Sequence, residues 1–342
     1  IWNDIIATRL KALKTNINYQ GFMNCATSKL DWRDFWRYFK ESFDSILLDA
    51  PCSGEGTMRK DEVRWSMSII EELAELQKKM ILSAIEALKV WGTLIYSTCT
   101  MTPEEDECIL DYVKTMLNDQ IEIVPWKLEW LISTPGISEW QWQVLHSECA
   151  NSQKIWPHKN NTEWFFIAKI VKKSSTNIFK TKIYYEKKNE EIILKGKELK
   201  ILYSQIKKRF KIDSFIFSDY LLVKKWQYIE IRTKQSKAFS SYPMIQNIGI
   251  PFWEILDNTF TLSFYSAQVF GKHASLNILN LIDEKQAELY RTGKDIILKN
   301  EQLENCSVWQ VIITYDGIIL GTSLLQKNNV LKNQVPRETI KI

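Results

Sequence analysis

The chain has 342 residues, of which 45% are hydrophobic and 25% are charged, so its length and composition fit a folded protein with two domains. No apolar run approaches the roughly 20 residues that a membrane span needs, and the N-terminus lacks the pattern of a secretory signal. We therefore expect a cytoplasmic protein with no membrane partner. The formal net charge of +4 is too small to indicate a polyanionic partner by itself.

The six cysteines are spread along the chain without a CxxC pair, which argues against a zinc site or a redox dithiol. We expect no bound metal. In a cytoplasmic protein these thiols should be free, so each is either a small packing residue or a nucleophile.

The first half of the chain alternates short apolar runs with helical patterns, which is typical of a parallel sheet covered by helices. One helix is predicted over 68–89 and a second over about 103–116, which begins with a proline as first turns often do. Glu104, Glu105 and Asp106 would then lie near the positive end of the second helix. The sequence predicts strands at 43–49, 93–96, 121–124 and 164–170.

The second half of the chain begins with a change of composition. Lysines crowd the stretch 169–211, which we interpret as a basic linker that runs into a basic helix with Lys207, Lys208 and Arg209. Short runs separated by turn signals follow, which favours a small α+β or barrel-like domain. The sequence predicts strands there at 214–223, 308–315 and 318–323.

Two cysteine segments directly follow predicted strands. Cys52 lies in DAPCSGEGT (49–57), and Cys99 lies in STCT (97–100). Ligands of open α/β sheets bind beyond the carboxyl ends of the strands, so we expect both thiols at such an edge. The glycines that follow Cys52 allow the backbone to approach a ligand closely.

These segments carry a resemblance to a known family. DAPCSGEGTMRKD (49–61), YSTCTMTPEEDE (96–107) and NDIIATRLKALKTNINYQG (3–21) resemble the Sun-type family of RNA cytosine-5 methyltransferases, its RsmF-like members in particular. The likeness covers about the first 170 residues. It continues more thinly through Gly249-Ile250-Pro251, Lys332-Asn333 and Pro336-Arg337, which look like the RNA-binding tail domain of those enzymes.

The resemblance implies a fold and a division into domains. Residues 1–172 would form an α/β, Rossmann-like methyltransferase domain that lacks its first strand and glycine-rich turn, because the chain starts at Ile1 and reads as a fragment. Residues 173–200 would be a basic linker. Residues 201–342 would form a smaller α+β or barrel-like, PUA-type RNA-binding domain.

The resemblance also implies a chemistry for the two thiols. Carbon 5 of cytosine is a poor nucleophile, and a thiolate that adds at carbon 6 activates it for methyl transfer. By resemblance Cys99 is that nucleophile, and Cys52 serves the release of the product. Asp49 would hydrogen-bond the cytosine edge and stabilise charge, and Lys60 beside the site could keep a thiolate ionised.

The implied cofactor is S-adenosylmethionine, and the implied partner is ribosomal or transfer RNA. By resemblance Asp4, Arg9, Asp31 and Asp49 bind the cofactor, with Asp4 at the position that holds ribose hydroxyls and Asp31 near the adenine. Basic residues of the linker would contact phosphates, and the target cytosine must leave its stack to reach Cys99. A monomer is the default expectation.

Other interpretations stay open at this point. The main alternative is a catalytically inactive RNA-binding or ribosome-assembly factor derived from such an enzyme; a DNA cytosine methyltransferase and a hydrolase that pairs Cys99 with His158 are weaker. Asp4 and Asp31 as plain surface acids, or Asp49 as a turn cap, are the structural alternatives. We interpret the remaining cysteines as packing residues: Cys25, Cys108, Cys149 and Cys306.

Tryptophan is unusually frequent, with 14 Trp against 11 Gly. Trp32, Trp91 and Trp164 stand where the resembling family has glycine. An indole can satisfy neither a positive φ nor a close backbone approach, so drift does not explain the pattern. Our hypothesis is that the source lineage reads the codon UGA as glycine, so that the natural protein carries glycine at positions 91 and 164 in place of Trp91 and Trp164.

Overall fold

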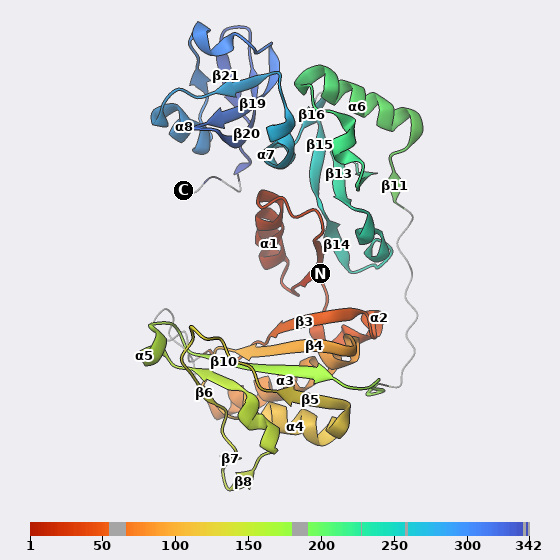
Figure 1. The fold of residues 1–342 in the computed structure, drawn as a ribbon, viewed down its shortest axis with the longest axis vertical. Coiled ribbons are helices and arrows are strands. Elements are labelled where there is room, and N and C mark those ends of the chain that lie inside the picture. The colour runs from red at the N-terminus through yellow and green to blue at the C-terminus, as the bar shows by residue number, and fades with distance from the viewer. Residues whose placement is uncertain (55–65, 180–190, 227, 257–258, 338–339, 341–342) are drawn as a thin grey trace. The chain divides into compact units, whose positions relative to one another are not determined.

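The computed structural model describes residues 1–342 except 55–65, 180–190, 227, 257–258, 338–339 and 341–342. It contains two compact units (Figure 1), one formed by 30–184 and one formed by 1–29 together with 185–342. The sequence-based division at 172 and 200 stays a prediction. Among the described residues, no helix combines the length and apolar character that a bilayer span requires.

The unit 30–184 is a mixed sheet with helices. Its helices are α2 (Trp36–Phe39), α3 (Met67–Ala87), α4 (Glu107–Leu117) and α5 (Pro157–Asn160). Its strands are β3 (Phe43–Asp49), β4 (Leu88–Thr98), β5 (Ile121–Val124), β6 (Ser133–Pro135), β7 (Glu139–Trp140), β8 (Gln143–Val144), β9 (Gln153–Ile155) and β10 (Phe165–Lys172). The main sheet has the order β3-β4-β10-β9-β6, and β5 also pairs with β10.

The strand directions in this sheet differ from a wholly parallel arrangement. β3 and β4 run parallel, with Asp49 opposite Ser97, whereas β10 runs antiparallel to β4, with Phe166 opposite Thr98. β3 and β4 lie side by side in Figure 1. Because parallel neighbours end at the same edge, the loops after these two strands emerge together, which positions both cysteine segments.

Two predicted elements of this unit have different outcomes. The helix predicted over 68–89 is α3, whose start is capped by the Ser66 hydroxyl accepting a hydrogen bond from the Ile69 N–H. The second helix begins at Glu107, so the start predicted near 103 is wrong. The reason lies in β4, where the Tyr96 hydroxyl donates to the Glu105 carbonyl and holds the preceding residues in a turn.

The unit of 1–29 and 185–342 contains three further sheets. Its helices are α1 (Ala7–Tyr19), α6 (Gly196–Phe210), α7 (Phe264–Phe270) and α8 (Glu284–Arg291). The sheet β1-β2-β14 consists of β1 (Trp2–Asn3), β2 (Ala26–Ser28) and β14 (Ile245–Ile248). The sheet β11-β12-β13-β15-β16 consists of β11 (Ile192–Ile193), β12 (Tyr220–Lys224), β13 (Tyr228–Thr233), β15 (Ile250–Leu256) and β16 (Thr259–Leu262). The sheet β17-β19-β20-β21-β18 consists of β17 (Ile278–Asn280), β18 (Ile296–Ile297), β19 (Trp309–Tyr315), β20 (Ile318–Leu325) and β21 (Val330–Asn333).

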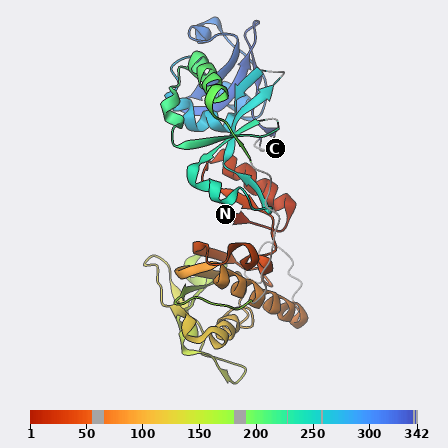
Figure 2. The same cartoon turned by 90° about the vertical axis from the view of Figure 1, so that its right-hand side faces the viewer.

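The N-terminal segment is part of this unit because it pairs with distant sequence. β2 is antiparallel to β14, and the Gly249 N–H donates to the Cys25 carbonyl at 2.8 Å. Both views show α1 beside the strands of residues 185–342 (Figure 1, Figure 2).

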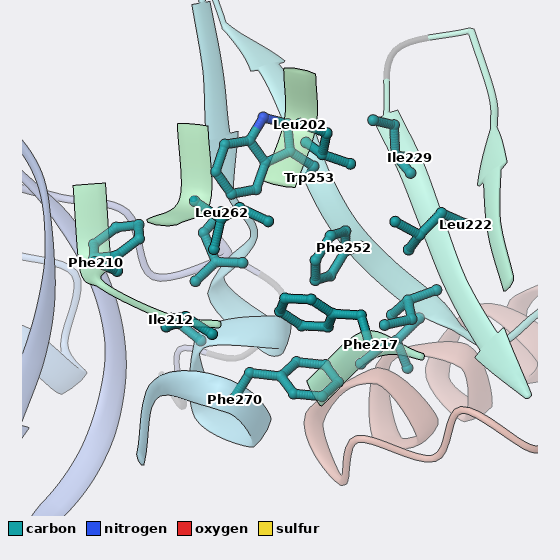
Figure 3. Close-up of a cluster of buried hydrophobic side chains, with 14 of the residues drawn as sticks. Leu202, Phe210, Ile212, Phe217, Leu222, Ile229, Phe252, Trp253, Leu262 and Phe270 are labelled. Atoms are coloured by element: carbon teal, nitrogen blue, oxygen red, sulfur yellow. The ribbon is translucent and has the colours of Figure 1, made fainter. Parts of the chain in front are cut away.

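An apolar cluster packs α6 against the sheet β11-β12-β13-β15-β16 of this unit. Figure 3 shows Phe217, Phe252 and Phe270 facing one another, with ring centroids 5.0–6.1 Å apart. The strand predicted over 214–223 is wrong in its first part. Asp213 accepts a hydrogen bond from the Phe215 N–H and starts a short 3-10 helix that inserts Phe217 into the cluster.

Backbone angles bear on the tryptophan hypothesis. Trp91 has φ +67°, and the same sign occurs at Trp142 and Trp309, with φ +66° and +100°. A side chain with Cβ rarely adopts such angles, whereas glycine does so readily. Trp164 is fully buried, and its indole N–H has no hydrogen-bond partner among the described residues. Trp32 begins a short 3-10 helix and stacks on Phe35, without a glycine-like feature. The codon assignment stays a hypothesis.

Candidate active site

The loops that follow β3 and β4 bring two thiols into contact. The Sγ atoms of Cys52 and Cys99 lie 3.2 Å apart, and the Cys99 N–H donates to Cys52 Sγ at 3.3 Å. Both side chains are partly exposed, and both are free thiols. A pair of accessible thiols in contact, at the carboxyl edge of a sheet, is suited to nucleophilic chemistry in which one thiol assists the other.

The two thiols differ in acidity. The pKa of Cys99 is lowered to about 7, chiefly because the Cys52 thiol donates a hydrogen bond that favours the thiolate. The pKa of Cys52 is raised, first by that same hydrogen bond and then by burial. Cys99 is therefore the more nucleophilic member at neutral pH, and Cys52 is the hydrogen-bond donor beside it.

Asp49 lies at the end of β3, next to the cysteine pair. Its carboxylate is exposed and accepts a hydrogen bond from the Ser97 hydroxyl at 3.2 Å. The charge of Asp49 opposes ionisation of Cys99, but less strongly than the Cys52 hydrogen bond favours it. Lys60, the other residue predicted for this site, lies outside the described residues.

A buried carboxylate beneath the loops was missed as a site residue. Glu105 accepts hydrogen bonds from the Ser53 N–H, the Ser53 hydroxyl, the Thr102 hydroxyl and the Gln77 amide, at 2.5–3.0 Å. We predicted Glu105 only as an acid near the positive end of a helix, whereas its side chain is fully buried. Its position two residues before the end of the segment 96–107 gave no separate signal of burial.

The two acids after Glu105 are also buried, and each has a polar partner. Asp106 accepts from the Thr98 hydroxyl at 2.5 Å, and its pKa is raised well above the usual range by burial. Glu107 forms an ion pair with Lys154 at 3.0 Å. These contacts tie the start of α4 to β4 and β9, so the turn that carries Glu105 has a fixed base.

The residues predicted to bind the cofactor lie in both units. Asp4 follows β1, where its Oδ1 accepts from the Ile6 N–H at 2.8 Å and its Oδ2 lies 3.4 Å from Arg9. Asp31 belongs to the unit 30–184 and accepts from the N–H, Nε and guanidinium nitrogen of Arg33. The Arg33 hydrogen bond also lowers the pKa of Asp31.

The remaining sulfur and imidazole groups have structural surroundings. Burial raises the pKa of Cys108 and of Cys149 to about 12, so both stay protonated at neutral pH. His158 lies on α5, with its ring 5.8 Å from that of Trp156. Among the described residues, no group of three or more His, Cys, Asp or Glu side chains could hold a metal ion.

Comparisons with known proteins match both halves of the chain. The family described as 16S rRNA methyltransferase RsmB/F matches residues 1–171. Two relatives carry the name ribosomal RNA small subunit methyltransferase F. The one from Shewanella piezotolerans is 30% identical over 350 residues, covering 99% of this chain and 68% of the relative. The one from Psychromonas ingrahamii is 32% identical over 350 residues, covering 100% of this chain and 68% of the relative.

The chain belongs to the RsmB/F family.

The C-terminal region of this RsmB/F-family chain has its own match, because the PUA domain described for the methyltransferase RsmF matches residues 280–341. The predicted resemblance and the predicted fold class, a Rossmann-like methyltransferase sheet followed by a PUA-type domain, are thereby confirmed. A crystal structure of a methyltransferase homologue from Pyrococcus horikoshii matches this chain with 31% sequence identity and a TM-score of 0.44. The match covers 50% of this chain and 52% of that one. Cys52, Cys99 and Glu105 all lie within the RsmB/F match.

Proposed function

We propose that this chain methylates carbon 5 of a cytosine in small-subunit ribosomal RNA, with S-adenosylmethionine as methyl donor and Cys99 as covalent nucleophile. Membership of the RsmB/F family and the names of the relatives support the RNA substrate. The observation that carries the mechanism is the Cys52–Cys99 contact at 3.2 Å. A binding module requires neither an acidic thiol nor a second thiol beside it.

The first step follows from the acidity of Cys99. Its thiolate adds to carbon 6 of the cytosine, which forms a sulfur–carbon bond and moves an electron pair toward carbon 5. Asp49, exposed at the end of β3, hydrogen-bonds the amine edge of the ring and stabilises charge there. The cofactor, when bound, supplies an electrophilic methyl group to carbon 5 and leaves as its demethylated sulfide.

Cys52 serves the release of the product. Once Cys99 is bonded to carbon 6, Cys52 loses the thiolate that raised its pKa, while the N–H groups of Cys99 and Gly54 still donate to its sulfur. Cys52 then gives its own proton to solvent and takes the proton from carbon 5. Elimination breaks the sulfur–carbon bond and returns Cys99 as a thiolate.

The residues predicted for the cofactor fit it unequally. Asp4 keeps acceptor capacity beyond the Ile6 N–H and Arg9, so it could hold ribose hydroxyls. Asp31 accepts four hydrogen-bond contacts from Arg33, which uses its carboxylate fully. Asp31 therefore does not fit as an adenine ligand while Arg33 holds it, and we assign the cofactor role to Asp4 alone of these two acids.

RNA contacts are assigned to the C-terminal region. The match to the RsmF PUA domain and the exposed Lys208 on α6 support this assignment. Arg209 on the same helix is a different case, because its guanidinium donates to the backbone of Ser307, Val308 and Gln310. We interpret Arg209 as a structural residue.

The test measures tritium released from small-subunit ribosomal RNA labelled at carbon 5 of cytosine, with S-adenosylmethionine added. We expect release by the wild-type protein, none by Cys99→Ala, and unchanged release by the control Cys108→Ala, whose thiol stays protonated. Release by Cys99→Ala at the wild-type rate would refute the covalent mechanism. Methylation without tritium release would place the methyl group elsewhere than carbon 5.

A further inference from the structure

We propose that Glu105 is the positioning residue of the cysteine pair: its buried carboxylate holds the Cys52 loop against Cys99 without touching the substrate. The catalytic meaning of this role rests on the proposed function. The positioning itself depends on hydrogen bonds among described residues of the unit 30–184.

Hydrogen-bond donors surround the Glu105 carboxylate. Its two oxygens accept from the Ser53 N–H at 3.0 Å, the Ser53 hydroxyl at 2.5 Å, the Thr102 hydroxyl at 3.0 Å and the Gln77 amide at 2.8 Å. These donors belong to the loop after β3, the turn after β4 and helix α3. An ionised carboxylate only accepts hydrogen bonds, so it suits four converging donors as no amide or hydroxyl could.

Both chain neighbours of Cys52 are tied to this carboxylate. Ser53 binds it directly through its N–H and hydroxyl. Pro51 is tied through Gln77, whose amide nitrogen donates to the Pro51 carbonyl and to the Glu105 carboxylate, each at 2.8 Å. With Pro51 and Ser53 both held, the Cα of Cys52 has little freedom to move from Cys99.

The other side of the contact is anchored as well. Thr100, which follows Cys99, has its hydroxyl 2.8 Å from the Ser53 hydroxyl. The backbone of Glu105 is held to β4 by the Tyr96 hydroxyl, which donates to the Glu105 carbonyl at 2.8 Å. The carboxylate therefore lies on a fixed base and links the two loops that carry the thiols.

Glu105 affects the pKa of Cys99 in two ways that have opposite signs, which makes the positioning role testable. The negative charge of Glu105 raises the pKa of Cys99, but it is the weakest of the influences on that thiol. The Cys52 hydrogen bond lowers the same pKa and is the strongest. If Glu105 acted only through its charge, removing the charge would lower the Cys99 pKa; if it positions Cys52, removing it raises the pKa.

The experiment is the pH dependence of alkylation of Cys99 by iodoacetamide in the full chain, read at this residue by mass spectrometry. In Glu105→Gln, the amide NH₂ is a donor and faces groups that are also donors. The hydrogen bonds that hold the Cys52 loop are therefore lost. We expect the midpoint to rise toward the ordinary thiol value of about 8.5, and the rate at pH 7 to fall about tenfold. The matched control is Glu104→Gln, because the donors to the Glu104 carboxylate among the described residues are the Trp140 indole and the Gln141 amide, which lie outside both cysteine loops.

A folded Glu105→Gln protein with an unchanged or lowered midpoint would overturn the proposal. If this variant loses its near-ultraviolet circular dichroism, the decisive variant is Ser53→Ala, which removes only the hydroxyl contacts. Its midpoint of Cys99 alkylation should also rise, and an unchanged midpoint would overturn the proposal. The readout does not depend on methyl transfer. Full methylation by Cys99→Ala would therefore refute the proposed function while leaving a midpoint shift in Glu105→Gln as support for positioning.

Discussion

The Cys99 N–H donates to the sulfur of Cys52 at 3.3 Å while the two sulfur atoms lie 3.2 Å apart, so Cys52 accepts from the backbone of the residue whose thiolate it stabilises. The hydrogen bond between the two side chains lowers the pKa of Cys99 to about 7 and raises that of Cys52, and the Cys99 N–H opposes the rise at Cys52. One thiol is thus ready to attack at neutral pH, and the other becomes available only after the first has reacted.

Replacing Cys52 by alanine should therefore slow alkylation of Cys99. Without the donated hydrogen bond, the Cys99 pKa should rise from about 7 to the ordinary value of about 8.5, which cuts the thiolate fraction at pH 7 by about 15-fold. The measurement is the rate of Cys99 alkylation between pH 6 and 9. Cys108→Ala is the control, and an unchanged Cys99 profile in Cys52→Ala would contradict the assigned hydrogen bond.

Trp91 should prefer replacement by glycine over alanine. At φ +67° an alanine Cβ is strained, so Trp91→Gly should be more stable than Trp91→Ala by about 1 kcal/mol in urea unfolding. Trp130 is exposed and does not have a positive φ, so the same pair of substitutions there should favour alanine. Equal preferences at Trp91 and Trp130 would remove the structural support for glycine at position 91.

Glu230 should make stability fall as the pH rises. Burial raises its pKa to about 7 despite Lys225 and Arg232 nearby, whereas the unfolded chain has a value of about 4.3. The folded state then binds more protons between these values, so the stabilisation is complete below about pH 4.5 and lost as the pH passes about 7.

The check compares wild type with Glu230→Gln in urea unfolding at pH 5 and pH 8. Relative to this variant, the wild type should lose up to roughly 3 kcal/mol across the interval. Glu198→Gln on the exposed side of α6 is the matched control, and its pH dependence should equal that of the wild type. Parallel curves for Glu230→Gln and wild type would show that Glu230 is ionised in both states.

The neighbours Lys208 and Arg209 should have separable roles. Lys208 is exposed, so Lys208→Ala should weaken RNA binding and reduce the salt dependence by about one counterion without loss of stability. Arg209→Ala should cost about 2–3 kcal/mol of unfolding free energy, because it removes charged hydrogen bonds to Ser307 and Gln310. Filter binding at several salt concentrations and urea unfolding test both; a destabilised Lys208→Ala protein would contradict the assignment.

The sequence predicted the parts of the site that depend on local pattern. The apolar run at 43–49 forms β3 over those residues, and the motifs placed Cys52 and Cys99 after neighbouring strands. The contacts of Glu105 could not be predicted, because a run of acids after a proline usually lies at a solvated helix start. Only the tertiary donors from Ser53 and Gln77 make burial of this carboxylate favourable.

Local sequence pattern also could not predict which distant segments pair. The antiparallel direction of β10 and the pairing of β2 with β14 depend on how the chain returns to a sheet edge, which hydrophobic period does not encode. Arg209 shows the same limit for a charged side chain. A basic helix is expected to be solvated, and the sequence of the helix does not reveal that Arg209 binds the Ser307–Gln310 backbone.

The most direct test of the account is to trap the covalent step. Cys52→Ala is mixed with small-subunit ribosomal RNA and S-adenosylmethionine at pH 8.5, where Cys99 ionises even without Cys52, and is resolved on a denaturing gel. We predict an RNA–protein adduct that is absent from the double variant Cys52→Ala, Cys99→Ala and does not accumulate in the wild type. An adduct that persists without Cys99, or no adduct on RNA that the wild type methylates, would contradict the account.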